Sequence, residues 1–506
     1  MTKDSQQGDR LAAAEARFEL MRKRVGLWLG PLAFLALLVF PVPAPSAEAA
    51  RLTAVLVLAL VWWITEAVPI PVTALLAPAL AVVMGIGTAQ EMFAPFGDPI
   101  VMMFLGGFLL AEAMSETGLD RRVAGHVLGH PWVGGSPARV LVAFVLLCAG
   151  VSAWMNNTST TAMLYPIALS VLAAMARGAG RDPKSLRFGT ALMLGLAWAA
   201  SIGGVMTPVG SAPNLIAIGQ LHKLTDERIP FLHWAAVGLP MALILLGVLL
   251  VYFRWALPPD VEPQPQASRV LAGEAVGTPM SRGERQVVAA FAITVFFWVL
   301  PGAVAAVLGT SDPVAAMLQK KIPESVVAIL GASLLFLMPP EPVTGRRPIT
   351  WQVAARIDWG TLMLFGGGLA LGGAMFRTGL AASLGNGLVS FTGSTSLVAL
   401  TCLFCWISIL LTETTSNTAT ATMLTPLGIA AAQAAGVPAA PVAMAIAFAA
   451  SMAFMLPVST PPNAIVYGSG SVRITQMARH GAVLDLAAAV LIPPVVLVGC
   501  HLLGLA

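Results

Sequence analysis

Long apolar segments follow one another along almost the whole chain. In the first half they lie near residues 25–42, 52–68, 71–88, 99–118 and 233–256. In the second half they lie near residues 287–303, 325–338, 359–376 and 481–504. Segments of this length and apolarity are typical of helices that cross the hydrocarbon core of a bilayer. The pattern therefore predicts an all-α polytopic membrane protein.

Four further apolar segments are interrupted by polar residues near their middle, at 139–175, 188–218, 395–435 and 441–470. The first and third are too long for one crossing and too interrupted for two. Two half-length helices that meet at a polar tip, a re-entrant hairpin, fit that pattern. In the second segment, Pro208 and Pro213 with Gly203, Gly204 and Gly210 would unwind a helix. We expect two hairpins and two broken helices.

The second half of the chain repeats the plan of the first. NNT at 156–158 matches SNT at 416–418 with a shift of 260, and PVGSAPN at 208–214 matches PVSTPPN at 457–463. FLGG and TGL in the first half likewise precede the hairpin in the same order as LFGG and TGL in the second. We therefore expect two repeats that each contain one hairpin and one broken helix.

This repeat divides the chain into five parts. We expect a cytoplasmic N-terminal lead-in (1–24), a first transmembrane helix and loop (25–50), a first repeat (51–257), a cytoplasmic linker (258–286) and a second repeat (287–506). The lead-in is charged and lacks a cleavage site, so it does not resemble a secretory signal. With five crossings in each repeat, the chain has about 11 transmembrane helices and the two repeats have inverted topology.

The positive charges test this topology. With the N-terminus inside, 22 of the 28 basic residues lie at the cytoplasmic side, and the external loops hold only Arg51, Lys223, Arg228, Lys320, Lys321 and Arg377. Because cytoplasmic loops are enriched in Lys and Arg, the bias supports a cytoplasmic N-terminus and an external C-terminus. The first hairpin then enters from the cytoplasm and the second from outside.

Composition excludes a soluble globular protein, because 57% of the residues are hydrophobic, 10% are charged and the mean hydropathy is +0.84. The net charge of +4 does not indicate nucleic-acid binding, since the basic residues stand singly in loops. Membrane lipid is the expected surrounding.

Chemistry of other kinds has little support in the sequence. Cys402 and Cys405 form a CxxC, but in an apolar helix without a second pair. No HExxH, GxSxG or GxxxxGK[ST] motif occurs, so a hydrolase or an ATP-driven pump is not indicated. An intramembrane enzyme that uses Glu413 or the Ser-rich loops stays as the alternative, although no nucleophile–base pair is visible. We expect no enzyme.

Small polar residues concentrate at the four helix breaks. The run at 411–426, LTETTSNTATATMLTP, contains Thr412, Thr414, Thr415, Ser416, Asn417, Thr418, Thr420 and Thr422. In a membrane such groups either bond back to helix carbonyls or line a wet cavity. The breaks at 152–158, 201–214, 412–418 and 451–463 contain no Arg or Lys. Their oxygens suit a hard cation such as sodium, and helix N-termini suit an anion beside it.

These motifs make the chain similar to the divalent anion/sodium symporter family. The resemblance rests on AASMAFMLPVSTPPNAIVYGSG at 449–470, on the two Asn-Thr tips and on SIGG followed by PVGSAPN. It implies an elevator-type transporter, a homodimer, and sodium-coupled uptake of a small dianion. The most favoured dianion is a C4-dicarboxylate such as succinate, with citrate, tartrate or sulfate as alternatives. A sodium-independent dicarboxylate exchanger is the other alternative. The resemblance also implies the inner (plasma) membrane of a bacterium.

The resemblance also assigns site residues by position. It places a first sodium ion at Ser152, Asn156, Asn157 and the carbonyl of Gly210, and a second at Thr412, Thr415, Asn417 and the carbonyl of Ser459. Substrate carboxylates would meet Asn157, Thr158, Ser416, Asn417 and Thr418, with Ser211, Thr460 and Pro461 nearby. Two positions depart from the family pattern, because Asn156 replaces a Ser and Ala212 replaces a Pro.

Four acidic residues lie in or near the apolar segments. We expect Glu413, inside the second tip, to bond the hairpin backbone rather than to titrate. Glu66 and Glu116 are interpreted in the same way. Glu112, deep in its span, stays as a candidate for a proton relay.

Overall fold

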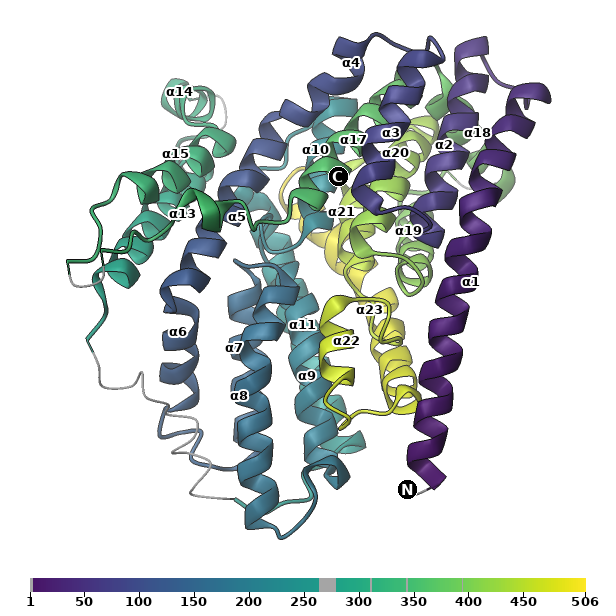
Figure 1. Cartoon of the computed structure of the whole chain (residues 1–506). Helices are drawn as coiled ribbons and strands as arrows, with labels where there is room; N and C mark the ends of the chain where they lie inside the picture. The colour runs from purple at the N-terminus through teal and green to yellow at the C-terminus, as the bar shows by residue number, and fades with distance from the viewer. Residues whose placement is uncertain (1–2, 264–278, 310–311, 343–344, 394) are drawn as a thin grey trace.

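The computed structural model describes the chain except residues 1–2, 264–278, 310–311, 343–344 and 394. All regular elements in these described residues are helices, which confirms the expected all-α class (Figure 1). Most of the predicted linker at 258–286 lies outside the described residues.

The first half of the chain comprises α1 (Lys3–Val39), α2 (Ala47–Thr65), α3 (Ile70–Val83), α4 (Ala89–Phe93), η1 (Ala94–Gly97), α5 (Pro99–Thr117), α6 (Leu119–Leu128), α7 (Pro137–Ser152), α8 (Asn157–Gly178), η2 (Pro183–Ser185), α9 (Arg187–Gly204), α10 (Ala212–Thr225) and α11 (Phe231–Ala256). The expected lead-in is the first part of α1, which continues without a break into the first apolar segment.

The second half comprises α13 (Arg282–Leu308), α14 (Pro313–Lys321), α15 (Glu324–Leu337), α16 (Trp351–Ala354), α17 (Trp359–Arg377), α18 (Leu380–Thr392), α19 (Leu397–Thr412), α20 (Asn417–Ala435), α21 (Ala440–Ala450), α22 (Pro461–Tyr467) and α23 (Ile474–Leu502). Within the described residues, seven helical segments are long and apolar enough to cross a membrane, and six shorter apolar helices accompany them.

All four predicted helix breaks are present. α7 ends at Ser152 and α8 begins at Asn157, while α19 ends at Thr412 and α20 begins at Asn417. α9 stops at Gly204, and α21 stops at Ala450. In both broken segments a proline stands in the first turn of the next helix, where its missing N–H costs no hydrogen bond.

Two amphipathic helices differ from the expected loops. α6 occupies part of the polar gap after α5, and α18 follows α17. Each begins after a glycine in the left-handed region, Gly118 at φ 76° and Gly379 at φ 77°. Because an L side chain rarely adopts this conformation, the glycine of each TGL motif allows the same sharp turn into the next helix.

The core lies where the broken helices pass between the hairpins. α9 is buried from Phe188 to Gly204, and every residue of α21 is buried. α10 of the first half packs on hairpin helix α20 of the second, and α22 packs on α8 of the first. Figure 1 shows α13, α14 and α15 on one side of this centre and α1 and α2 on the other. The halves are therefore interleaved rather than separate.

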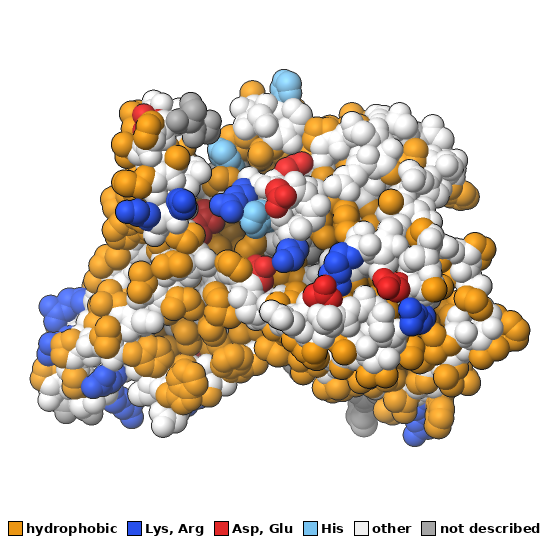
Figure 2. Space-filling view, turned by 90° about the horizontal axis from the view of Figure 1, so that it is seen from above, with side chains coloured by type: hydrophobic (Ala, Val, Ile, Leu, Met, Phe, Trp, Pro, Cys, Tyr) orange, Lys and Arg blue, Asp and Glu red, His pale blue; other side chains and the backbone are white. Residues whose placement is uncertain are grey.

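The surface view separates two kinds of face. Figure 2, seen from the upper end of Figure 1, shows charged side chains gathered across the middle and hydrophobic side chains along the margins. Many large hydrophobic side chains of α1, α11 and α23 are exposed, such as Trp28 at 71%, Trp255 at 82% and Val490 at 59%. Exposed apolar helix faces are what lipid requires.

Candidate binding site at the hairpin tips

The first hairpin tip is closed by its own side chains. The Ser152 hydroxyl, on the last residue of α7, donates a 2.8 Å hydrogen bond to Oδ1 of Asn157, the first residue of α8. Asn156 Oδ1 accepts a 2.7 Å bond from the Ser159 N–H and so caps α8. Asn156, which the family resemblance assigns to the first sodium site, thus serves as an N-cap. Ser152 and Asn157 bring two oxygens together.

The second tip repeats this arrangement at a shift of 260 residues. The Thr412 hydroxyl lies 2.8 Å from Oδ1 of Asn417, and Ser416 caps α20 by accepting from the Ala419 N–H at 3.1 Å. Among the described residues, neither Asn157 nor Asn417 uses its Nδ2 group to donate to protein. Each tip thus pairs two oxygens and leaves an amide donor beside them.

The unwound loops of the two broken helices are held by equivalent asparagines. Asn214 Nδ2 donates to the carbonyls of Gly204 and Thr207, both at 2.8 Å. Asn463 Nδ2 donates to the carbonyls ten and seven residues earlier, Ala453 and Leu456, both at 3.0 Å. Since both asparagines are fully buried, each fixes a non-helical loop inside the protein.

Backbone oxygens crowd around Gly210 in the first loop. A methyl group added at Gly210 would lie 2.7 Å from the carbonyl oxygen of Gly204 and 2.9 Å from those of Ser152 and Ala153. A methyl group at Gly204 would lie 2.6 Å from Asn157 Oδ1. Carbonyl and amide oxygens are the donors that a hard cation takes. The predicted first sodium residues Ser152, Asn157 and Gly210 are therefore brought together.

The second tip is tied to the loop after α21. Glu413 Oε1 accepts from the Phe454 and Met455 N–H groups at 2.7 and 2.9 Å. Ser459 Oγ lies 2.8 Å from both the backbone oxygen and Oε2 of Glu413. Glu413 therefore bonds backbone, as the sequence predicts, although the backbone is that of the neighbouring loop. It also brings Ser459 to the tip.

The two remaining predicted ligands of the second sodium site, Thr412 and Thr415, make hydrogen bonds within the protein. The Thr412 hydroxyl donates to the Ala450 carbonyl at 2.7 Å, in addition to its contact with Asn417. The Thr415 hydroxyl contacts the Leu411 carbonyl at 2.9 Å and the Thr420 hydroxyl at 2.8 Å. Both side chains are buried. Thr412 thus ties the tip to α21, and Thr415 ties the two helices of the hairpin to each other.

Burial divides the predicted residues into two groups. The proposed cation residues are buried apart from the two tip asparagines and Asn156: Ser152, Gly210, Thr412, Thr415 and Ser459. Most of the proposed substrate residues are exposed or half-buried: Asn157, Thr158, Ser416, Asn417, Thr418 and Pro461. Ser211 and Thr460 are buried; Ser211 Oγ lies 3.2 Å from Ser451 Oγ, and Thr460 caps α22.

Arg22 contacts the second hairpin tip, which itself contains no Arg or Lys. Arg22 of α1 donates from Nη1 to the Thr414 carbonyl at 3.0 Å. The breaks themselves contain no Arg or Lys, as expected, but α1 supplies one from nearly 400 positions away. No motif marks Arg22, because it stands in a short run of basic residues that looks like an interfacial flank.

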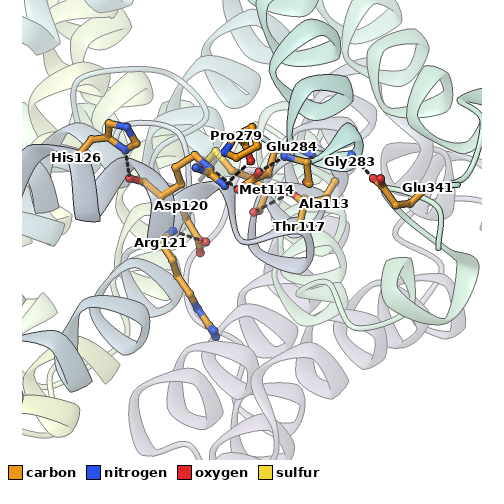
Figure 3. Close-up of polar contacts among 12 residues, drawn as sticks. Ala113, Met114, Thr117, Asp120, Arg121, His126, Pro279, Gly283, Glu284 and Glu341 are labelled. Carbon is orange, nitrogen blue, oxygen red and sulfur yellow. Dashed lines mark hydrogen bonds and ion pairs between the residues drawn. The ribbon is translucent and has the colours of Figure 1, made fainter. Parts of the chain in front are cut away.

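Another charged contact lies outside the tips. Arg122 Nε of α6 is 2.7 Å from Glu284 Oε1 at the start of α13, and the Gly283 N–H donates to Glu341 Oε2 at 3.3 Å. Figure 3 shows these contacts grouped beside the end of α5. The helix that leads into the first hairpin is thereby tied to the start of the second half.

Glu112 lies among other charged side chains near the end of α5. It lines a polar cavity of about 470 Å³ with Ser115, Glu116, Arg121 and Arg356. Glu116 and Arg356 form an ion pair of 3.7 Å there. This places the acidic candidate for a proton relay in a different group of side chains.

A helical membrane protein with paired hairpins and broken helices has the architecture of a secondary transporter. The family model described as "Sodium:sulfate symporter transmembrane region" matches residues 23–503. The chain therefore belongs to the sodium:sulfate symporter family, which confirms the resemblance found in the sequence, and it is a transporter rather than an enzyme.

Curated relatives cover nearly the whole chain. The sodium-dependent dicarboxylate transporter SdcS of Staphylococcus saprophyticus is 34% identical over 479 residues, which cover 93% of this chain and 90% of that protein. SdcS of Staphylococcus aureus strain NCTC 8325 is 34% identical over 476 residues, which cover 92% and 89%.

Solved structures support the fold alone. The YdaH transporter of Alcanivorax borkumensis matches with a TM-score of 0.55 and 14% identity, covering 83% of this chain and 88% of that chain. MtrF of Neisseria gonorrhoeae matches with a TM-score of 0.50 and 13% identity, covering 92% and 94%. Both are membrane transporters by their titles.

Proposed function

We propose that this protein carries a small dianion together with sodium ions across the membrane, and that the dianion is a C4-dicarboxylate such as succinate. The observation that carries the proposal is the pair of tips at which Ser152 and Asn157, and likewise Thr412 and Asn417, hold two oxygens 2.8 Å apart. The relatives named as sodium-dependent dicarboxylate transporters support both ligands.

The tips provide a route for coupling. The amide oxygen of Asn157 faces the cation oxygens, and its Nδ2 group is free to donate to a carboxylate. Asn417 offers the same pair of groups in the second half. One side chain that contacts both ligands makes each ligand favour the binding of the other, which is the thermodynamic meaning of coupling.

The repeated contacts support an inverted repeat and an elevator-type movement. Asn214 and Asn463 hold their loops at identical sequence offsets, and the hairpins begin their second helices at equivalent residues. In this proposal the hairpins and the broken helices move as one unit against the other helices. The protein works as a homodimer in the plasma membrane with its N-terminus in the cytoplasm.

The departure from the family pattern at Asn156 is a reason to consider other substrates. Asn156 fills the cap position that Ser416 fills in the second half, and its longer side chain enlarges the polar tip next to Asn157 and Thr158. A larger cap changes the space left for the anion, so citrate, tartrate or sulfate are the second candidates. Sodium-independent dicarboxylate exchange is the third.

Uptake by proteoliposomes distinguishes these functions. The measurement is the accumulation of labelled succinate with an inward sodium gradient, with an equal choline gradient, and with unlabelled succinate preloaded inside. Symport predicts that succinate accumulates with the sodium gradient, without preloading, and does not accumulate with the choline gradient. Uptake that needs preloading and ignores sodium would support the exchanger, and uptake of labelled sulfate or citrate in place of succinate would change the substrate.

A further inference from the structure

A single arginine of the first helix contacts the tip of the second hairpin. Arg22 Nη1 donates to the Thr414 carbonyl at 3.0 Å, and Arg22 Nη2 lies 3.6 Å from Glu66 Oε2. Thr414 stands in the four-residue turn between α19 and α20, with the proposed cation residues Thr412 and Thr415 on either side. The guanidinium therefore bridges the end of α2 and the tip.

The Arg22 side chain is built into this position rather than lying loose on the surface. Its exposed fraction is 18%, and its Nε atom is buried. Glu66, which holds the other side of the guanidinium, caps α2 in the left-handed region at φ 49°. A non-glycine residue rarely adopts that conformation, so the backbone at Glu66 is held in a position that costs energy.

The equivalent residue of the first hairpin makes a contact of different chemistry. Trp154 corresponds to Thr414 at the shift of 260, and its ring lies 5.1 Å from that of Phe291 on α13 and 6.1 Å from that of Phe231. Both tips are therefore anchored at the same position by a helix outside the hairpins. The first anchor is apolar, whereas the second is a charged hydrogen bond.

Because Arg22 contacts the second tip, its position along α1 indicates how deep in the membrane that tip lies. Arg22 lies just before the apolar stretch that begins near residue 25, at the end of the span next to the N-terminus. A hairpin tip that reaches this level is displaced toward the side of the membrane on which the N-terminus lies. If the hairpin moves across the membrane, this contact has to break.

We propose that Arg22, supported by Glu66, is a positioning residue that holds the second hairpin tip in the conformation seen here and releases it when the transport unit moves. The proposal rests on the elevator movement given above. It does not depend on which dianion is carried. A hydrogen bond from a charged donor is strong enough to change the balance of two conformations by on the order of tenfold.

Thiol labelling tests the proposal. Thr414 is exposed and uses its backbone oxygen to meet Arg22, so Thr414→Cys keeps the contact. Cys402→Ser removes the native thiol that is not buried. In this background a membrane-impermeant maleimide is added to one face of the vesicles at a time. The variants are Arg22→Gln, Glu66→Gln and, as a matched control on an exposed residue of the same helix, Arg24→Gln.

If Arg22 holds the tip in one conformation, its loss changes the labelling rates from the two faces in opposite directions, whereas a more flexible tip would not. Arg22→Gln is expected to slow labelling from the N-terminal face and to speed it from the opposite face, Glu66→Gln to do the same more weakly, and Arg24→Gln to change neither. Faster labelling from the N-terminal face alone, or no change from either face, would overturn the proposal. Labelling from one face only in every variant would instead contradict the movement itself, and so the proposed function.

Discussion

Asn157 and Asn417 are the first residues of α8 and α20, and the amide oxygen of each lies 2.8 Å from the hydroxyl oxygen five residues earlier. In both hairpins the amide oxygen thus faces other oxygens, and the amide nitrogen has no protein acceptor among the described residues. In the proposed function, this relationship gives one side chain an oxygen for the cation and an N–H donor for the anion.

Asn417→Asp separates the two roles of that side chain. Aspartate keeps an oxygen for sodium but replaces the Nδ2 donor with a negative charge, so a dianion is repelled. We expect sodium to stabilise the variant as it stabilises the wild type, while the affinity for succinate falls by at least about tenfold. Thermal unfolding with sodium alone and with sodium plus succinate measures both effects. Equal stabilisation by succinate in the variant and the wild type would contradict the assigned role.

Gly210→Ala tests the oxygen cluster of the first loop. The added methyl group would meet three carbonyl oxygens within 2.9 Å, so the loop has to shift and the proposed cation site would be lost. The expected cost is about 1–3 kcal/mol of stability, with a strong loss of sodium-dependent stabilisation. Gly150→Ala on α7 is the matched control, because nothing lies within 4 Å of its added methyl group. Thermal unfolding as a function of sodium concentration compares the two.

Much of this site follows from the sequence because its causes are local. Glycines and a proline follow one another at the end of α9, prolines stand in the break after α21, and the tip motifs start α8 and α20, so the breaks are predicted from the residues alone. α6 and α18 lie outside the predicted spans because both are too short to cross a membrane, and α6 is in addition amphipathic and rich in polar residues. The contact between Arg22 and Thr414 depends on how distant elements pack, and no local pattern encodes it.

Glu413→Gln tests the tie between the second tip and the loop after α21. One carboxylate oxygen becomes an NH2 group, so the Phe454 and Met455 N–H groups or the Ser459 hydroxyl lose an acceptor. The expected loss is about 1–3 kcal/mol, seen as a lower unfolding temperature in the absence of ligand. An unchanged unfolding temperature would show that the carboxylate does not hold the loop.

Asp485→Asn is expected to act in the opposite direction. Asp485 of α23 is 5% exposed and interacts with the Glu413 side chain and the Phe454 backbone. A buried carboxyl group that faces a second carboxylate favours its neutral, protonated form, and asparagine has nearly the same shape and also carries no charge. We expect Asp485→Asn to keep or raise the unfolding temperature near neutral pH. A large decrease would show that the carboxylate is needed.

Asn156→Ser asks whether the unusual cap sets the substrate. Serine is also a good N-cap, so stability is expected to change by less than about 0.5 kcal/mol, whereas Asn156→Ala costs about 1 kcal/mol. The shorter side chain leaves more room beside Asn157 and Thr158. Competition of succinate, citrate, tartrate and sulfate for labelled succinate uptake should therefore change in rank in Asn156→Ser. An unchanged rank would place selectivity elsewhere.

The dependence of succinate binding on sodium tests the central claim most directly. The dissociation constant of labelled succinate is measured on purified protein in sodium and in choline, and the sodium affinity is measured with and without succinate. Coupling through Asn157 and Asn417 predicts that sodium tightens succinate binding, that succinate tightens sodium binding by the same factor, and that Asn157→Ala or Asn417→Ala abolishes both effects. The same succinate affinity in sodium and in choline would contradict the account.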